Sequence, residues 1–492
     1  MEQKKKTLTQ LFVPICLETL LYMLSGMVDT LMLSSVNDQA VGAVGTANTY
    51  IGIFIIMFSV ISSGMVAVMT QNIGAGRPGV AYQARQLGLA FNAVLGIIMS
   101  LFLSLGAGVI LSGVGVADAL MQPAKTYLQI VGGFCILNAL IPICSSYLRA
   151  FGFSKEPLYA SITGNVINFC LNAFFLFVLH KGVAGVATAT VISRIINLVI
   201  VVTLGAVLVK AKQHPERESN REVMGQIIRI GLPSACETAI YNVSMTLVIR
   251  FLNQMDAQGL NVTARSYTMQ ITNFSYCVGA ALAQANAIMT GWRIGAKEYD
   301  ACDRGTRKAA IIGVIVAVIL ETMFAFCSGW IMQLFSKDPQ MVSLVGKLLA
   351  IDIVLEMGRV TNLVYGQALK TSGDAVFPVV MGACFMILCS VGGTYLFGIR
   401  LGLLAVGAYI GMAGDECVRA VGMYLRWKAE SGKKRDWLNP GSFVAPAGTT
   451  WKNQSVGGNR KTDLAGGDCT IGGAKHRAYH IGKNCRLQTG GI

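Results

Sequence analysis

The residues best placed to do chemistry are acidic side chains inside long apolar stretches. Glu18, Tyr22, Ser25 and Asp29 follow one another at helical spacing, i, i+4, i+7 and i+11. Eleven residues complete about three helical turns, so Glu18 and Asp29 share one helix face and lie about 16 Å apart along its axis. A charged side chain at membrane depth is costly and usually faces a cavity where it has a function, so this stripe predicts a functional site at Asp29. The alternative is that Asp29 only caps or packs the end of its helix.

Carboxylates outnumber arginines in these apolar stretches. Eight carboxylates facing lipid would cost on the order of 20 kcal/mol, so we expect them to point inward or to be paired. Their excess favours a cationic ligand over an anionic one. The carboxylates are Glu18, Asp29, Glu237, Glu321, Asp352, Glu356, Asp415 and Glu416, and the arginines are Arg194, Arg250, Arg265, Arg359 and Arg419.

Two further polar faces stand at helical spacing. Asn168 and Asn172, one turn apart, offer amide oxygens that suit a sodium ion, or they form hydrogen bonds between helices. Asp352, Glu356 and Arg359 also share a face. They form either a closed ion-pair network or a second site for a cation, to which Glu18, Tyr22 and Glu237 are also assigned. We expect Asp415 and Arg419 to pair, and Glu321 to be buried without a partner.

The elements that position these residues must lie in lipid. The chain has 492 residues, of which 53% are hydrophobic and only 13% charged, whereas soluble proteins carry roughly 25% charged residues. A helix needs about 20 apolar residues to cross a bilayer. We therefore predict an all-α integral membrane protein with twelve transmembrane helices, near 10–33, 46–70, 87–111, 124–148, 157–179, 183–209, 227–250, 265–289, 307–331, 343–368, 377–397 and 402–425.

Basic residues indicate the orientation. The net charge is +15, but most lysines and arginines lie in alternate short loops, starting with Arg77 and Arg85, and in the C-terminal end. Loops rich in Lys and Arg stay in the cytoplasm. We therefore expect a multi-pass protein of the cell membrane with both termini cytoplasmic, and no binding to nucleic acid. Residues 438–492 hold eleven glycines and no apolar run, which predicts disorder.

The chain contains an internal repeat. The segment from Pro14 to Ser25 matches Pro233 to Ser244, and the match continues at three later places with an offset of 217–221 residues. Parallel repeats of six helices are typical of transporters that alternate access to a site between their halves. We predict an N-terminal lobe at 1–209, a linker at 210–226 and a C-terminal lobe at 227–437. Val248 stands where the second copy would have its counterpart of Asp29, so the two lobes differ chemically.

Several of these features together resemble the multidrug and toxic compound extrusion (MATE) family, over about residues 8–430. The resemblance rests on the order and spacing of Pro14…Asp29-Thr30, Gln71…Gly74-Ala75, Arg149…Gly152…Pro157, Asn168…Asn172 and Gly185-Val-Ala-Thr-Ala-Thr190. It implies two six-helix bundles in a V that exchange small organic cations for sodium ions or protons. It also implies that Asp29 is the coupling aspartate. In the family an aspartate often stands at the position of Asn172.

The resemblance predicts a cation-coupled multidrug antiporter, and we expect it to be a monomer in the lipid bilayer. The sequence leaves open whether H⁺ or Na⁺ is the coupling ion, and we expect no other cofactor. An enzyme is disfavoured because no nucleophile or metal-binding motif lies in the apolar stretches. The alternative is a flippase for lipid-linked precursors from the same superfamily, which would need basic residues in its cavity.

Overall fold

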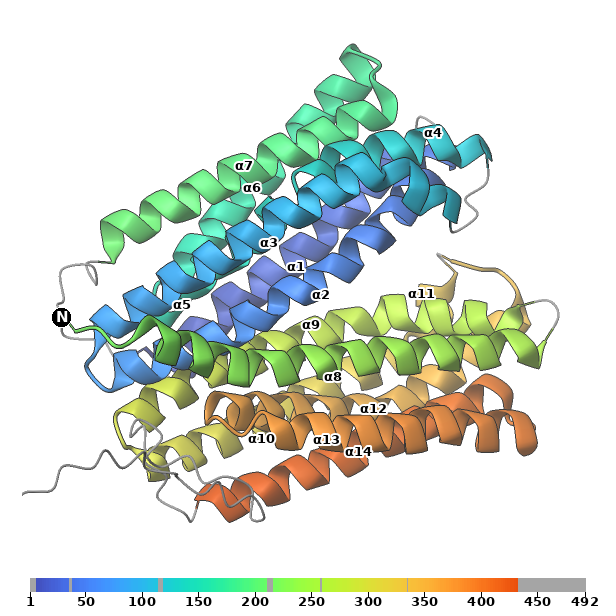
Figure 1. Ribbon diagram of the computed structural model, residues 1–492. Helices are drawn as coiled ribbons and strands as arrows, with labels where there is room; N and C mark the ends of the chain where they lie inside the picture. The colour runs from blue at the N-terminus through green and yellow to red at the C-terminus, as the bar shows by residue number, and fades with distance from the viewer. Residues whose placement is uncertain are drawn as a thin grey trace, which may run out of the picture. The chain divides into compact units, whose positions relative to one another are not determined.

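Helices are the only regular elements in the residues that the computed structural model describes, which are 6–34, 38–113, 118–209, 216–256, 259–333 and 335–431 (Figure 1). In lipid, backbone N–H and C=O groups find no water, and a helix satisfies them within one segment. The predicted all-α class is confirmed. The tail at 438–492 lies outside the described residues.

The first half of the chain forms seven α-helices and two π-helical segments that continue them. Their bounds are α1 Leu8–Ser34, α2 Asp38–Gly74, α3 Pro78–Gly113, α4 Asp118–Tyr127, η1 Leu128–Gly132, α5 Ile136–Ala150, α6 Lys155–Ala173, η2 Phe174–Val178 and α7 Gly182–Leu208.

The second half follows the same pattern. Its elements are α8 Asn220–Met255, α9 Leu260–Gly295, α10 Tyr299–Phe326, α11 Ser328–Met332, α12 Pro339–Thr371, α13 Val376–Phe385, η4 Met386–Val391, η5 Thr394–Arg400 and α14 Leu404–Ser431. Helix α8 begins at Asn220, so the last part of the predicted linker at 210–226 is helical.

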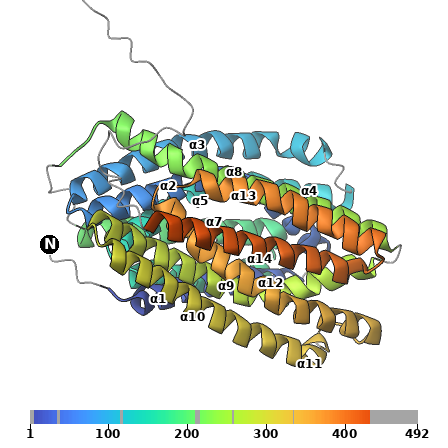
Figure 2. The same cartoon turned by 90° about the horizontal axis from the view of Figure 1, so that it is seen from below.

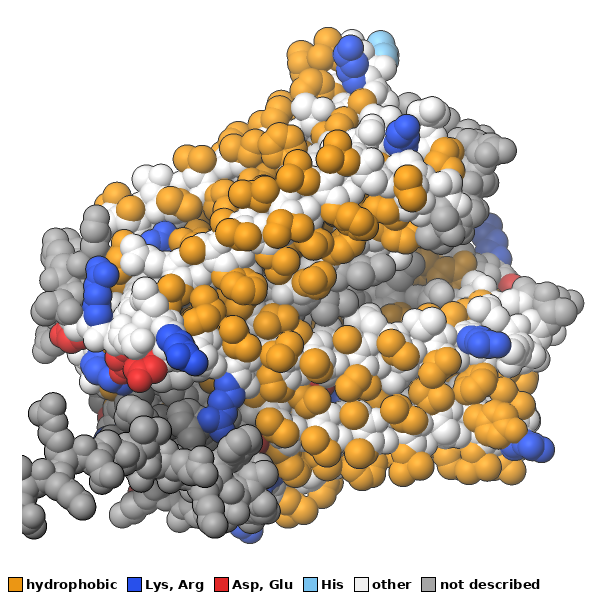
Figure 3. All heavy atoms as spheres, viewed as in Figure 1, with side chains coloured by type: hydrophobic (Ala, Val, Ile, Leu, Met, Phe, Trp, Pro, Cys, Tyr) orange, Lys and Arg blue, Asp and Glu red, His pale blue; other side chains and the backbone are white. Residues whose placement is uncertain are grey.

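Within the described ranges, six helices are long and apolar enough to cross a membrane. A seventh span results if Leu120–Gly132 and Ile136–Ala150, bent by 43° at their junction, cross as one. The other predicted spans fall in α2, α8, α9, α12 and α14, and their crossing remains a prediction. Hydrophobic side chains spread over the middle of the face in Figure 3, with Lys and Arg mostly toward its two ends.

Four tight turns lie at the end of the molecule where α2, α5, α9 and α12 finish, which we call the proximal end. Gly76 and Lys297 follow α2 and α9 with φ of 74° and 61°, and Gly152 and Gly373 follow α5 and α12 with φ of 88° and 94°. These left-handed conformations suit glycine and end helices. Within each pair the positions differ by 221 residues, so the same turn recurs at the offset of the predicted repeat.

The two halves of the chain meet mainly through α1, α2, α8 and α9. Helix α2 packs against α8 and α9, and α1 packs against α9. Leu11 and Ile15 of α1 share a buried apolar cluster with Ala281, Ala285 and Ile288 of α9. Within the second half, α12 packs against both α9 and α14 (Figures 1 and 2). This packing surrounds the acidic residues of α12 with protein.

Candidate functional site

Asp29, Asn168 and Asn172 come together in the first half, although 143 residues separate the aspartate from Asn172. The Asn172 amide donates hydrogen bonds to Asp29 Oδ1 at 2.7 Å and to Asn168 Oδ1 at 3.1 Å. Asn172 is 0% exposed and Asn168 5% exposed. The packing of α1 against α6 produces this arrangement. The three predicted ion-coupling residues therefore form one cluster.

The cluster offers oxygen atoms that a cation could use. Asn172 Oδ1 has no hydrogen-bond partner among the described residues. Asp29 is only partly buried, so its carboxylate remains accessible. Carboxylate and amide oxygens are the ligands that hard cations take. The arrangement can hold one small monovalent cation, and the same carboxylate can hold a proton.

A positive charge lies near this cluster, which the sequence did not indicate. Arg194 of α7 is the main charged neighbour of Asp29, and it also interacts electrostatically with the buried Tyr127. The sequence shows Arg194 only as one of several arginines in apolar stretches. Its spatial relation to Asp29 depends on how α7 packs, and no motif marks it.

Glu18 and Glu237 take part in matching ion pairs. Glu18 Oε2 lies 2.6 Å from Arg149 Nη2, and Glu237 Oε2 lies 2.6 Å from Lys370 Nζ. The first pair joins α1 to α5, and the second joins α8 to α12. Glu18 and Asp29 share a helix face but have different partners: Arg149 contacts Glu18, and Asn172 donates to Asp29. Tyr22, one turn after Glu18, is 66% exposed.

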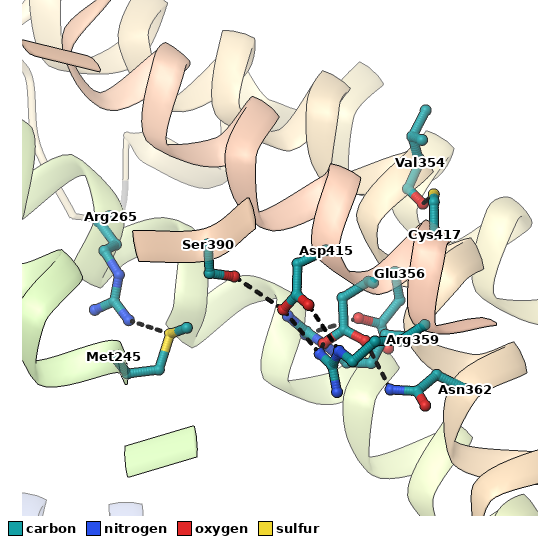
Figure 4. Close-up of polar contacts among 11 residues, drawn as sticks. Met245, Arg265, Val354, Glu356, Arg359, Asn362, Ser390, Asp415 and Cys417 are labelled. Carbon is teal, nitrogen blue, oxygen red and sulfur yellow. Dashed lines mark hydrogen bonds and ion pairs between the residues drawn. The ribbon is translucent and has the colours of Figure 1, made fainter. Parts of the chain in front are cut away.

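The other predicted acids lie in a buried network between α12 and α14 (Figure 4). Arg359 Nη1 lies 2.8 Å from Glu356 Oε2, and Arg359 Nε lies 3.5 Å from Glu416 Oε1. Arg419 Nη2 lies 2.8 Å from the same Glu416 oxygen, and Arg419 Nε lies 2.8 Å from Asp415 Oδ1. The expected Asp415–Arg419 pair is therefore present.

This network leaves several acidic oxygens without partners. Both oxygens of Glu321 on α10, Asp352 Oδ2 and Glu356 Oε1 are buried and have no hydrogen-bond partner among the described residues. Ser275 Oγ of α9 also has no partner within hydrogen-bond distance, but it lies near enough to interact with the carboxyl group of Glu321. Glu321 interacts electrostatically with Asp352 and Glu356. The second half therefore contains an ion-pair network and, beside it, buried acidic oxygens without hydrogen-bond partners among the described residues. The second cation site stays a prediction.

No group of three or more His, Cys, Asp or Glu side chains in the described ranges is arranged to hold a metal ion. Glu18 and Glu237 belong to different ion pairs, and Asp352 and Glu356 lie in the network between α12 and α14. The residues assigned to a second cation site therefore occupy three places.

A family model described as MatE matches the chain twice, at residues 14–174 and 233–396. The chain is 33% identical over 434 residues to the uncharacterized transporter YisQ of Bacillus subtilis, covering 87% of this chain and 94% of that protein. It is 24% identical to the probable multidrug resistance protein NorM of Thermotoga maritima, covering 88% and 94%.

Solved structures share the fold at low identity. A crystal structure of MATE in the bent conformation superposes with a TM-score of 0.79 at 17% identity, covering 87% of this chain and 95% of that one. The outward-facing conformation of a multidrug resistance MATE family transporter of the MOP superfamily gives a TM-score of 0.78 at 17% identity, covering 87% and 96%.

Proposed function

The chain belongs to the MatE family of multi-pass membrane transporters, and from this premise we propose that it is an antiporter that exports small organic cations in exchange for H⁺ or Na⁺. The observation that carries the proposal is the cluster of Asp29, Asn168 and Asn172. It supplies one carboxylate and one unpaired amide oxygen in a protected position.

Exchange requires that the coupling ion and the exported cation favour different states of the protein. Asp29 carries a single negative charge, so one monovalent cation or one proton neutralises it. A bound ion at Asp29 weakens the attraction for an organic cation nearby, and its departure restores that attraction. Arg194 adds a fixed positive charge that lowers the affinity for any cation and favours release.

The acids of the second half also favour a cationic substrate. Five carboxyl groups (Glu321, Asp352, Glu356, Asp415 and Glu416) face two guanidinium groups, Arg359 and Arg419. Buried charges without partners are costly in a membrane. We therefore assign the excess carboxyl groups to hold protons or to attract the cationic substrate. An anionic lipid precursor would meet repulsion here, which argues against the flippase alternative.

Alternating access supplies the transport step. In this proposal two lobes of six spans each rock about the contacts that α1 and α2 make with α8 and α9. Both chain termini lie in the cytoplasm. The proximal end, where the basic loops lie, is then the cytoplasmic end. The lobes act within one monomer.

Efflux from cells tests the proposal. A drug-sensitive bacterial host that expresses the chain should retain less of a fluorescent cationic dye than the host alone. Collapsing the pH gradient should abolish this difference if H⁺ couples transport, and collapsing the sodium gradient should abolish it if Na⁺ does. Dye retention equal to that of the empty host, with the chain present in the membrane, would reject the antiporter.

A further inference from the structure

Two side-chain donors join the halves of the chain at the proximal end. The side-chain amide of Gln71 on α2 donates to the backbone oxygen of Thr371, the last residue of α12. The indole N–H of Trp292 on α9 donates to the backbone oxygen of Ala150, the last residue of α5, at 2.8 Å. Carbonyls at the end of a helix have no partner within it, so both acceptors are free for such bonds.

The two bonds are the same contact made twice in opposite directions. Trp292 follows Gln71 by 221 residues, and Thr371 follows Ala150 by 221 residues. Each half therefore reaches across to the corresponding carbonyl of the other half. We call these bonds the two latches. Two equivalent bonds that cross the same interface open most readily together, when the halves separate.

Glycines bring the backbones of α2 and α9 into contact between the latches. A Cβ atom added to Gly74 would collide with the carbonyl of Trp292, and one added to Gly295 would collide with the carbonyl of Gln71. A Cβ atom at Gly291 would collide with the side chain of Thr70. Small residues four apart allow such close helix crossings in membranes. The latch donors thus sit directly on a close backbone contact between the halves. A second such contact joins α2 to α8 at Gly64 and Gly231.

Farther from the proximal end, glycines of α1 and α2 make no such close contact. A Cβ atom added to Gly26 of α1, or to Gly45 or Gly52 of α2, would meet nothing within 4 Å. Leu31, near the end of α1, is 67% exposed. The surface in Figure 3 is hollowed between the two sets of helices on that side. The halves are therefore held together at the proximal end and apart at the other.

One further side chain ties the interface to the ion pairs of the first half. Arg149 Nη1 donates to Gln284 Oε1 of α9 at 3.2 Å while Arg149 Nη2 contacts Glu18.

We propose that Gln71 and Trp292 are gate residues of the transport cycle. Their latches hold the proximal, cytoplasmic end closed while the opposite end is open, and they release together when the protein opens to the cytoplasm. The proposal rests on the alternating-access antiporter described above, and it adds the residues that control one of its two gates.

Spin labels can measure the opening directly. Lys155 and Val376 are the first residues of α6 and α13, both are exposed, and they belong to opposite halves at the proximal end. Labels at Lys155→Cys and Val376→Cys, in a full-length chain whose native cysteines are replaced, report the distance between the halves in lipid nanodiscs by pulsed electron paramagnetic resonance.

Two variants remove one donor each. Gln71→Met keeps the length of the side chain, and Trp292→Phe keeps an aromatic ring but is smaller. Each should raise the ratio of long to short distances about fivefold, the effect of one net hydrogen bond. The double variant should exceed either single variant. The matched controls Gln86→Met and Trp330→Phe alter exposed side chains away from the interface, and they should leave the distances unchanged.

Gly295→Ala gives an independent route if a latch variant does not fold. It forces the helices apart without removing a donor, and Gly225→Ala, whose added Cβ would meet nothing within 4 Å, is its control. Unchanged distances in the latch variants and in Gly295→Ala, with each protein eluting as a single folded species, would overturn the proposal. The spin-label distances are measured without substrate, so they test the gate separately from transport. If the distances shift in the variants but the wild-type protein transports no cation, the antiporter is refuted and the gate is not.

Discussion

Asn172 donates a 2.7 Å hydrogen bond to the carboxylate of Asp29, from α6 to α1. In the related family an aspartate often occupies the position of Asn172, so this chain has one carboxylate where a pair is common. The amide can orient Asp29 without adding charge. A site with a single negative charge binds a monovalent ion more weakly than a paired site and releases it more readily.

Replacing Asn172 with leucine removes this hydrogen bond and keeps the number and branching of the side-chain heavy atoms. A lost bond in a buried site costs about 1–3 kcal/mol, so we expect the rate of ion-coupled transport to fall about tenfold. Initial rates in proteoliposomes measure the effect. Asn253→Leu, an exposed position near the end of α8, is the control. Equal rates for the two variants would show that Asn172 does not serve Asp29.

The matching ion pairs of the two halves should differ in strength. Arg149 contacts Glu18 and also donates to Gln284 in the other half, whereas Lys370 contacts Glu237 alone among the described residues. Breaking a largely buried pair costs about 3–5 kcal/mol, and one further hydrogen bond adds about 1 kcal/mol. Arg149→Gln should therefore lower the free energy of unfolding more than Lys370→Gln does, measured by denaturation in mixed micelles. Equal losses would mean that the bond to Gln284 contributes nothing.

Arg359 should be essential to the stability of the second half. It contacts both Glu356 and Glu416, so Arg359→Leu leaves two buried acids with less compensation. We expect the free energy of unfolding to fall by about 3–5 kcal/mol. Arg250→Leu, at an exposed position of α8, should change it by less than about 0.5 kcal/mol. A folded, equally stable Arg359→Leu protein would contradict the network.

Glu321 and Glu416 provide a contrast between an unpaired and a paired acid. Neither oxygen of Glu321 has a hydrogen-bond partner among the described residues, whereas Glu416 contacts two arginines and accepts a bond from Asn362 at 3.0 Å. Glu321→Gln should therefore leave stability within about 0.5 kcal/mol of the wild type, and Glu416→Gln should cost about 3 kcal/mol. Chemical denaturation of both variants measures the difference, and the reverse order would rule out this assignment.

The sequence predicted the helical class and the family because those depend on local patterns and on the order of motifs. It also predicted that Asp29, Asn168 and Asn172 act together, since each lies on the polar side of an apolar helix. It placed Glu18 on the same helix face as Asp29 and assigned it to a second cation site. A shared face does not show which neighbouring helix covers it, and Arg149 of α5 covers Glu18.

Sequence patterns could not predict the contacts between segments that lie far apart in the chain. The resemblance includes Gln71 in a motif, but its acceptor is a backbone carbonyl 300 residues away, and backbone atoms leave no trace in a sequence. Only the internal repeat points to Trp292, which occupies the position of Gln71 in the second copy. Arg194 has none, because its relation to Asp29 arises from the packing of α7.

Ion-coupled transport by purified protein in liposomes tests the central claim most directly. An imposed pH or sodium gradient should drive a cationic dye across the membrane with the wild-type chain and with Asp300→Asn, which alters an exposed aspartate at the start of α10. Asp29→Asn should remove the dependence on the gradient and leave only leakage equal to that of empty liposomes. Gradient-driven transport by Asp29→Asn at the wild-type rate would contradict the account.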